Sequence, residues 1–195
     1  MFETEQKKYK ALNEFAECGG VVILGGTEDV SIPIGELKQA FSIEEKVYNR
    51  SMKDLSIVDA CAAYKECVAP IAPETILLHM GDADLALFRM DAWKFIQKYN
   101  ELISCVKDDN KNCRIAIISL RNYEDDATIT ELNKQLKYIA ESNCCEYVDI
   151  ANKRVWNPKS MIETSSFMYS MGFVRPLKCM RSLYDLVKYF FVSFA

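Results

Sequence analysis

The sequence predicts a three-layer α/β/α sandwich built on a mostly parallel sheet of about five strands. Two observations predict this fold class. Short apolar runs that end in glycine or polar residues, as at residues 21–24 and 75–80, are typical of strands buried on both faces of a parallel sheet. Between the runs lie segments whose apolar residues recur at helical spacing, and such alternation implies right-handed crossovers covering a parallel sheet.

The first half of the chain supplies two helices and three strands. A polar, lysine-rich segment predicts a helix over residues 3–17, and the apolar run before Gly25 predicts the first strand. Residues 46–49 are a weaker strand candidate. Apolar residues at helical spacing predict a helix over residues 57–68, which the following prolines end, and the next strand covers residues 75–80.

The second half continues the alternation. A helix is expected to start at Thr128, because its hydroxyl is a candidate N-cap and Glu131 stands at the capping-box spacing. The other expected elements are a helix over about 91–106, strands over 114–119 and 145–150, an irregular connection over 151–170 and a closing helix over 177–194. Together the elements predict a single flavodoxin-like domain over residues 1–195.

Composition and charge narrow the classes of function. Hydrophobic residues make up 50% of the chain and charged residues 27%, which excludes a largely disordered protein. The net charge of −4 gives no broad attraction to phosphate or anionic lipid, so neither nucleic acid nor a membrane is expected as a partner. No signal-peptide core opens the sequence and no apolar run is long enough for a membrane span, so we expect a cytoplasmic protein.

The eight cysteines are expected to be reduced and mostly buried, because a domain of this size is stable without bridges. They form no Cys-x-x-Cys pair, and the chain has one histidine, so a zinc site has too few suitably spaced ligands. Neither a metal nor a cofactor is expected.

Ligands of open parallel sheets bind in the crevice at the carboxyl ends of the strands. Residues 25–31, 81–88 and 120–128 follow three such ends, and residues 152–175 follow the last predicted strand. We therefore expect functional side chains in these four loops.

Four sequence blocks resemble the SGNH/GDSL hydrolase family. That family places a nucleophilic serine in a Gly-Asp-Ser turn after the first strand, a glycine after the second, Gly-x-Asn-Asp after the third and Asp-x-x-His before the last helix. Here residues 22–27 (Val-Ile-Leu-Gly-Gly-Thr), 47–51 (Val-Tyr-Asn-Arg-Ser), 76–84 (Ile-Leu-Leu-His-Met-Gly-Asp-Ala-Asp) and 171–176 (Met-Gly-Phe-Val-Arg-Pro) lie at these places. The resemblance covers nearly the whole chain and implies the family's fold and a hydrolase ancestry.

The catalytic positions depart from the family pattern. Thr27 stands at the serine position, Ser51 at the oxyanion-hole glycine, Ala83 at the oxyanion-hole asparagine, and Met171 and Val174 at the aspartate and histidine. Valine cannot accept a proton, and removing a triad member typically costs several orders of magnitude in rate. The loss of one oxyanion-hole donor lowers the rate by a further factor of about 10²–10³. The resemblance therefore implies an inactive hydrolase-like domain.

Three groups of candidate residues keep alternative interpretations. Thr27 is a vestigial nucleophile, a hydrogen-bonding residue for a substrate, or a helix N-cap. His79 is expected to be a satisfied core histidine packed against the helices, with a functional base as the alternative. The acids after the two glycine turns are Glu28, Asp29, Asp82 and Asp84. They are expected to be solvated turn residues or caps, with a divalent-cation site or an acid/base pair as the alternative. The crevice is expected to contain Gly26, Thr27, Glu28, Asn49, Ser51, Gly81, Asp82, Ala83, Asp84, Met171 and Val174, with Asp29 among the acids.

The predicted function is that of an SGNH/GDSL hydrolase-like domain that has lost catalysis and keeps the crevice for ligand binding or scaffolding. The expected ligand is a small molecule or a carbohydrate ester, and no partner protein is indicated. One alternative is an esterase or acylhydrolase acting on acyl or acetyl esters, with its residues rearranged around Thr27. The other is a structural interaction partner in a polysaccharide or cell-envelope pathway.

Overall fold

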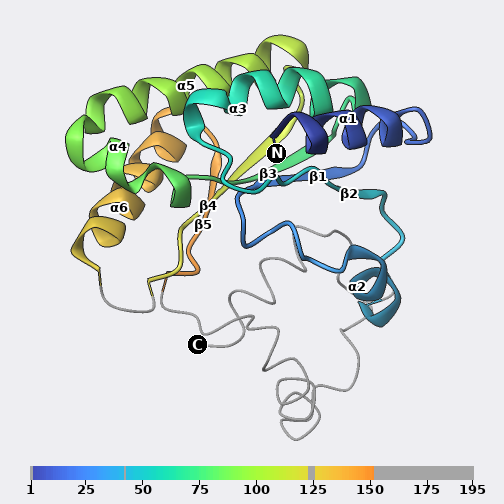
Figure 1. Ribbon diagram of the computed structural model, residues 1–195, viewed down its shortest axis with the longest axis horizontal. Helices are drawn as coiled ribbons and strands as arrows, with labels where there is room; N and C mark the ends of the chain where they lie inside the picture. Colours follow the sequence, from blue (N-terminus) through green and yellow to red (C-terminus); the bar gives the residue numbers. More distant parts are fainter. Residues whose placement is uncertain (1, 42, 123–125, 152–195) are drawn as a thin grey trace, which may run out of the picture.

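The sheet has five parallel strands in the order β2-β1-β3-β4-β5 (Figure 1). The computed structural model describes residues 2–41, 43–122 and 126–151. The strands are β1 Val21–Gly25, β2 Val47–Asn49, β3 Thr75–His79, β4 Arg114–Ile118 and β5 Glu146–Val148. This strand order is that of flavodoxin-like sheets, so the predicted fold class is confirmed.

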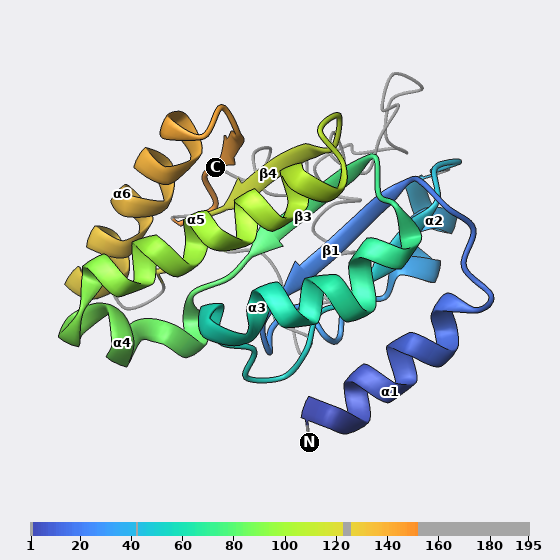
Figure 2. The same ribbon diagram turned by 90° about the horizontal axis from the view of Figure 1, so that it is seen from above.

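Helices lie on both faces of the sheet (Figures 1 and 2). They are α1 Phe2–Asn13, α2 Ile34–Phe41, α3 Ile57–Ala63, α4 Leu85–Met90, α5 Ala92–Asp109 and α6 Ala127–Ser142. Figure 1 shows α1, α3 and α5 above the sheet and α2 below it. The helices α4 and α6 contribute Phe88 and Leu132 to the same core as α3 and α5.

Neighbouring side chains of each strand enter different cores, because successive residues of a strand point to opposite faces. Leu24 and Leu78 belong to the core under α3, α5 and α6. Ile23 and Leu77 belong to the second core, against which Ile34 of α2 packs. The same alternation places His79, two residues after Leu77, on the second face.

The fold differs from the sequence prediction in local details. The helix expected over residues 57–68 is α-helical only as far as Ala63 and continues as a π-helical turn, Tyr64–Val68. The N-cap of α6 is Asp126, whose carboxylate accepts a hydrogen bond from the backbone N–H of Thr128. The prediction of Thr128 as the cap is therefore wrong by two residues, and α2 and α4 were not predicted.

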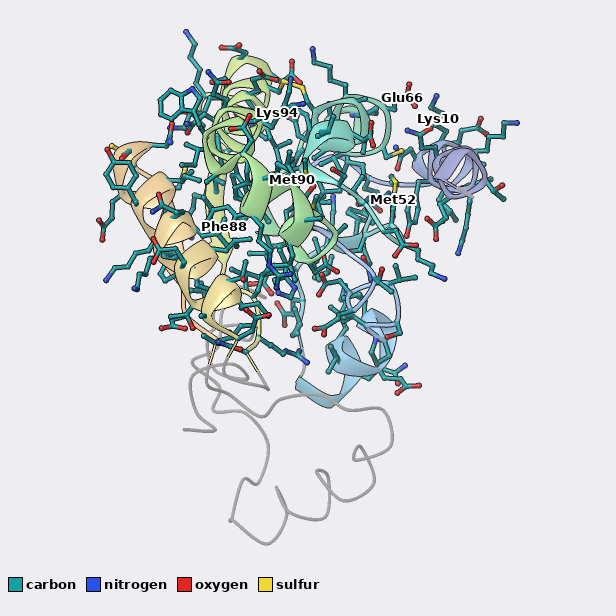
Figure 3. All side chains as sticks on the ribbon, turned by 60° about the vertical axis from the view of Figure 1, so that its left-hand side comes forward. Lys10, Met52, Glu66, Phe88, Met90 and Lys94 are labelled. Atoms are coloured by element: carbon teal, nitrogen blue, oxygen red, sulfur yellow. A yellow bond between two sulfur atoms is a disulfide. The ribbon has the colours of Figure 1, made fainter. Side chains whose placement is uncertain are left out.

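The amino-terminal helix α1 is tied to the rest of the fold by polar contacts. Lys10 and Glu66 lie side by side in Figure 3, and their ion pair measures 3.0 Å. The hydroxyl of Tyr9 donates a 2.6 Å hydrogen bond to the carbonyl oxygen of Ser51, directly after β2. These contacts fix α1 against the π-helical turn and against the loop that follows β2.

A disulfide joins Cys61 of α3 to Cys105 of α5. The expectation of eight free thiols is therefore wrong for these two residues, which lie 44 positions apart and share no spacing motif. Disulfides persist in oxidising compartments, so the bridge counts against the expectation of a cytoplasmic protein, which stays a prediction. Within the described part of the chain, no helix combines the length and apolar character needed to cross a membrane.

The expected extent of the domain is not tested beyond residue 151. The irregular connection and closing helix predicted over residues 151–194 lie almost entirely outside the described residues. A single domain over residues 1–195 stays a prediction.

Candidate functional site

A pocket of about 240 Å³ lies at the carboxyl ends of β1, β3 and β4. Its wall is formed by Glu28, Asp29, His79, Asp82, Leu85, Leu120, Arg121, Asp126 and Ile129. The chain enters the sheet at β1 and then extends it in both directions, so β1 and β3 flank the point where the strand order reverses. This is where open α/β sheets place their ligands.

A buried histidine–aspartate pair forms part of the pocket wall. The ring Nδ1 of His79 lies 3.0 and 2.9 Å from the two carboxylate oxygens of Asp29, and each residue is 6% exposed. An ionised carboxylate only accepts hydrogen bonds, so Nδ1 carries a proton and donates it to Asp29. The ring Nε2 is buried and has no hydrogen-bond partner among the described residues.

The environment of His79 shifts its pKa in two opposing ways. Burial lowers the pKa of the imidazole, but the charge of Asp29 and the hydrogen bond to it raise the pKa further, and the net pKa is raised. His79 is buried and its Nδ1 is hydrogen-bonded, as expected of a core histidine, but its partner is Asp29 of the β1 loop and the residue also lines the pocket. The side chain lies on the second face of the sheet, at its carboxyl edge, where Asp29 and the pocket meet it.

Two glycines allow the acidic side chains to approach the backbone of the β1 loop. A Cβ atom on Gly25 would overlap the carboxylate of Asp29, and a Cβ atom on Gly26 would overlap that of Asp82. Gly25 also pairs directly with His79 in the sheet. The glycine pair that resembles part of the family's first block therefore packs two carboxylates into the pocket wall.

Two asparagines hold the loops that carry the site. Asn49, at the end of β2, donates a 2.7 Å hydrogen bond to the backbone oxygen of Asp29. Asn133 of α6 is buried, and its amide group both accepts from the backbone N–H of Leu120 and donates to the carbonyl of Leu120. Asn49 thus positions Asp29, and Asn133 positions the backbone immediately before Arg121.

Asp82 and Asp84 have different roles despite standing two residues apart. Asp84 accepts hydrogen bonds from the Ser56 hydroxyl at 2.5 Å and from the Ile57 backbone N–H at 2.8 Å, so it holds the start of α3. Asp82 lies in the pocket wall, and burial raises the pKa of its carboxyl group. Within the described ranges, no group of three or more His, Cys, Asp or Glu side chains is arranged to hold a metal ion.

Thr27 lies outside the pocket wall. Its exposed hydroxyl donates to the Asp54 carboxylate at 3.1 Å and accepts from the Asp54 backbone N–H at 2.9 Å. The N-cap interpretation of Thr27 is wrong, because residues 27–31 form turns and α2 begins only at Ile34.

The other predicted crevice residues are only partly brought together. Ser51 is fully buried, and its backbone N–H donates to the Asn49 side chain. Ala83 is exposed in the turn that follows Gly81. The β1 loop contacts the loops after both β2 and β3, through Thr27 with Asp54 and through Gly26 with Asp82. Met171 and Val174 lie outside the described residues.

Sequence reasoning missed Arg121 and Asp126 as parts of the site. The Arg121 guanidinium lies 3.8 Å from the Glu28 carboxylate with only 8% of its side chain exposed, although the residue is charged and stands three positions after the end of β4. Asp126 pairs with Arg89 at 3.3 Å. A charged residue in the first positions of the loop after a buried strand was the available signal for Arg121.

Comparison with solved structures places this geometry in a known fold. A GDSL-like lipase from Bacteroides thetaiotaomicron is 15% identical, with a TM-score of 0.62 over 95% of this chain and 94% of that one. The chain has the fold of SGNH/GDSL hydrolases. The psychrotrophic esterase EstA from Pseudoalteromonas is 12% identical, with a TM-score of 0.58 over 77% and 94% of the two chains. An acetylxylan esterase from Geobacillus stearothermophilus is 15% identical, with a TM-score of 0.52 over 80% and 96%.

No protein-family model and no curated protein matches the sequence. At identities this low, the likeness establishes the SGNH/GDSL hydrolase fold alone. The resemblance drawn from the four sequence blocks is confirmed at that level.

The His79–Asp29 pair predicts a measurable shift in the titration of the only histidine in the chain. In the wild-type protein the NMR titration midpoint of the His79 ring is expected above the ordinary value of about 6.5. In Asp29→Asn the negative charge is gone and burial remains, so the midpoint is expected below 6.5. An unchanged midpoint in Asp29→Asn would show that the pair does not exist in solution.

Proposed function

We propose that this chain is a ligand-binding domain with the SGNH/GDSL hydrolase fold that does not hydrolyse acyl esters through Thr27. One observation carries the proposal. The chain has a single histidine, and its Nδ1 is bonded to Asp29 in the pocket wall, whereas the hydroxyl of Thr27 is bonded to Asp54. No imidazole is therefore hydrogen-bonded to the hydroxyl at the nucleophile position.

The chemistry of acyl transfer explains why this arrangement favours binding over catalysis. A threonine hydroxyl needs an adjacent base to remove its proton and an acid to protonate the leaving group. Ala83, at the oxyanion-hole asparagine position, also offers no side-chain amide to a developing oxyanion. The pocket keeps its place at the strand ends, its polar wall and its apolar residues, which are features of a binding site.

The alternative function is an esterase that uses Thr27 with an acid in place of histidine. The hydrogen bond from the Thr27 hydroxyl to the Asp54 carboxylate is the observation that favours it. Asp54 comes from the loop after β2.

An esterase assay separates the two functions. The wild-type protein is expected to hydrolyse p-nitrophenyl acetate no faster than a buffer blank, and Thr27→Ala is expected to leave that rate unchanged. The matched control is Ser31→Ala, which removes another exposed hydroxyl from the same turn. Hydrolysis that is well above background in the wild type, persists in Ser31→Ala and disappears in Thr27→Ala would establish the esterase instead.

A further inference from the structure

Two buried acceptor atoms of residues in the pocket wall have no hydrogen-bond partner among the described residues. Four carboxylates contribute to it, from Glu28, Asp29, Asp82 and Asp126. Three of them face a basic side chain within the protein: Glu28 faces Arg121, Asp29 faces His79, and Asp126 faces Arg89. Among the described residues, Asp82 is the wall carboxylate that has no ion pair.

One oxygen of the Asp82 carboxylate is buried without a hydrogen-bond donor. Its Oδ1 atom is buried and has no hydrogen-bond partner in the described part of the chain. A buried carboxylate oxygen without a donor is costly, and a ligand that supplies one would recover that cost. Burial raises the pKa of Asp82, which agrees with a carboxyl group held away from water.

A second buried atom of the wall also lacks a partner. His79 is 94% buried, and its Nε2 has no hydrogen-bond partner among the described residues. Because Nδ1 donates its proton to Asp29, Nε2 of the neutral ring is an acceptor. Asp82 and His79 therefore present two unpartnered acceptors in the wall of the same pocket.

The remaining wall residues define the rest of the ligand. Leu85, Leu120 and Ile129 give the pocket an apolar side. A volume of about 240 Å³ accommodates a short chain rather than a large ring system. A ligand that fits both sides has a compact donor group at one end and a few methylene groups at the other.

We propose that this pocket binds a small organic cation that has N–H donors on a short apolar chain, such as a primary alkylammonium. The ammonium group donates to Oδ1 of Asp82 and to Nε2 of His79, and its charge balances Asp82. The apolar chain contacts Leu85, Leu120 and Ile129. The inference rests on the proposed binding function and names the class of ligand for it.

The test follows the ring resonances of His79 while n-butylammonium is added at about pH 8.5, where an alkylamine is still protonated. The chain has one histidine, so these resonances report on the pocket without ambiguity. They are expected to shift in a saturable manner with n-butylammonium. They are expected not to shift with 1-butanol, with butyrate or with tetramethylammonium, a cation that has no N–H donor.

A pair of variants tests the role of Asp82. Asp82→Asn is expected to weaken n-butylammonium binding about tenfold or more, because a charge-assisted hydrogen bond is lost. The control is Asp108→Asn, an exposed carboxylate near the end of α5, which removes the same charge and is expected to leave binding unchanged. If Asp82→Asn does not fold, the titrations of the wild-type protein with the four compounds still test whether the pocket prefers a cation with N–H donors.

Three results would overturn the inference. Binding of butyrate or 1-butanol in place of n-butylammonium would contradict a cationic ligand, but it would still agree with the proposed binding function. Equal binding of n-butylammonium and tetramethylammonium would reject the hydrogen bonds. An absence of any shift with all four probes would reject the ligand class, whereas the proposed loss of hydrolysis is decided separately by the esterase assay.

Discussion

Asp29→Ala is expected to lower the free energy of unfolding by about 3–5 kcal/mol, because it removes one partner of a buried ion pair and leaves the other without compensation. Both residues of the pair are 6% exposed, and the Nδ1–oxygen distances are 3.0 and 2.9 Å. Urea denaturation at pH 6 measures the loss. The matched control is Glu101→Gln, which removes an exposed ion pair with Lys98 on α5 and is expected to change the stability by no more than about 0.5 kcal/mol.

The same pair predicts how stability depends on pH. Because the pKa of His79 is raised in the folded protein, its contribution is fully present below the unfolded value of about 6.5 and is lost as the pH rises through the folded-state pKa. Unfolding free energies measured across that window are therefore expected to fall with rising pH in the wild type. In Asp29→Asn this fall is expected to disappear or reverse. A loss below about 1 kcal/mol for Asp29→Ala at pH 6 would contradict a buried ion pair.

Breaking the Cys61–Cys105 disulfide is expected to lower the free energy of unfolding by about 4 kcal/mol. The bridge closes a loop of 44 residues, and the chain-entropy estimate for a loop of this length gives that value. It also joins α3 to α5, two helices of the main core. The comparison is urea denaturation of the double variant Cys61→Ala/Cys105→Ala against the oxidised wild type.

The control for the bridge is Cys18→Ala, which removes an exposed free thiol and is expected to leave stability unchanged. Thiol titration of the denatured, unreduced protein checks the bridge itself. Two of the eight cysteines are oxidised, so at most six are expected to react before reduction. Eight reactive thiols together with an unchanged double variant would show that α3 and α5 are held by packing alone.

The sheet could be predicted from the sequence because its strands are buried on both faces. The apolar runs that form β1, β3 and β4 are continuous, and each is followed by a loop of glycine or polar residues. The helices α2 and α4 were missed because they span only 8 and 6 residues, too few to show a helical period within a segment that follows a glycine turn.

The candidate site was only partly predictable, because its central contact depends on strand order. Asp29 and His79 lie 50 residues apart, and only the adjacency of β1 and β3 brings Gly25 beside His79. The alternation of side chains along β3 predicts which face of the sheet His79 occupies. It does not predict that the loop containing Asp29 lies beside His79 on that face. Thr27 was found by its place in a family block, and its bond to Asp54 follows from a contact 27 residues away.

Gly26 couples the turn after β1 to the pocket wall. In the family's Gly-Asp-Ser turn, the residue before the nucleophile is aspartate, and Gly26 occupies that place here. Any side chain at position 26 overlaps the carboxylate of Asp82. A substitution of Gly26 by aspartate alone would therefore require the Asp82 carboxylate to move from its position in the pocket wall. The shape of the pocket wall is thus coupled to the absence of a side chain at position 26, and any substitution there is expected to alter the ligand-binding surface as well as the turn.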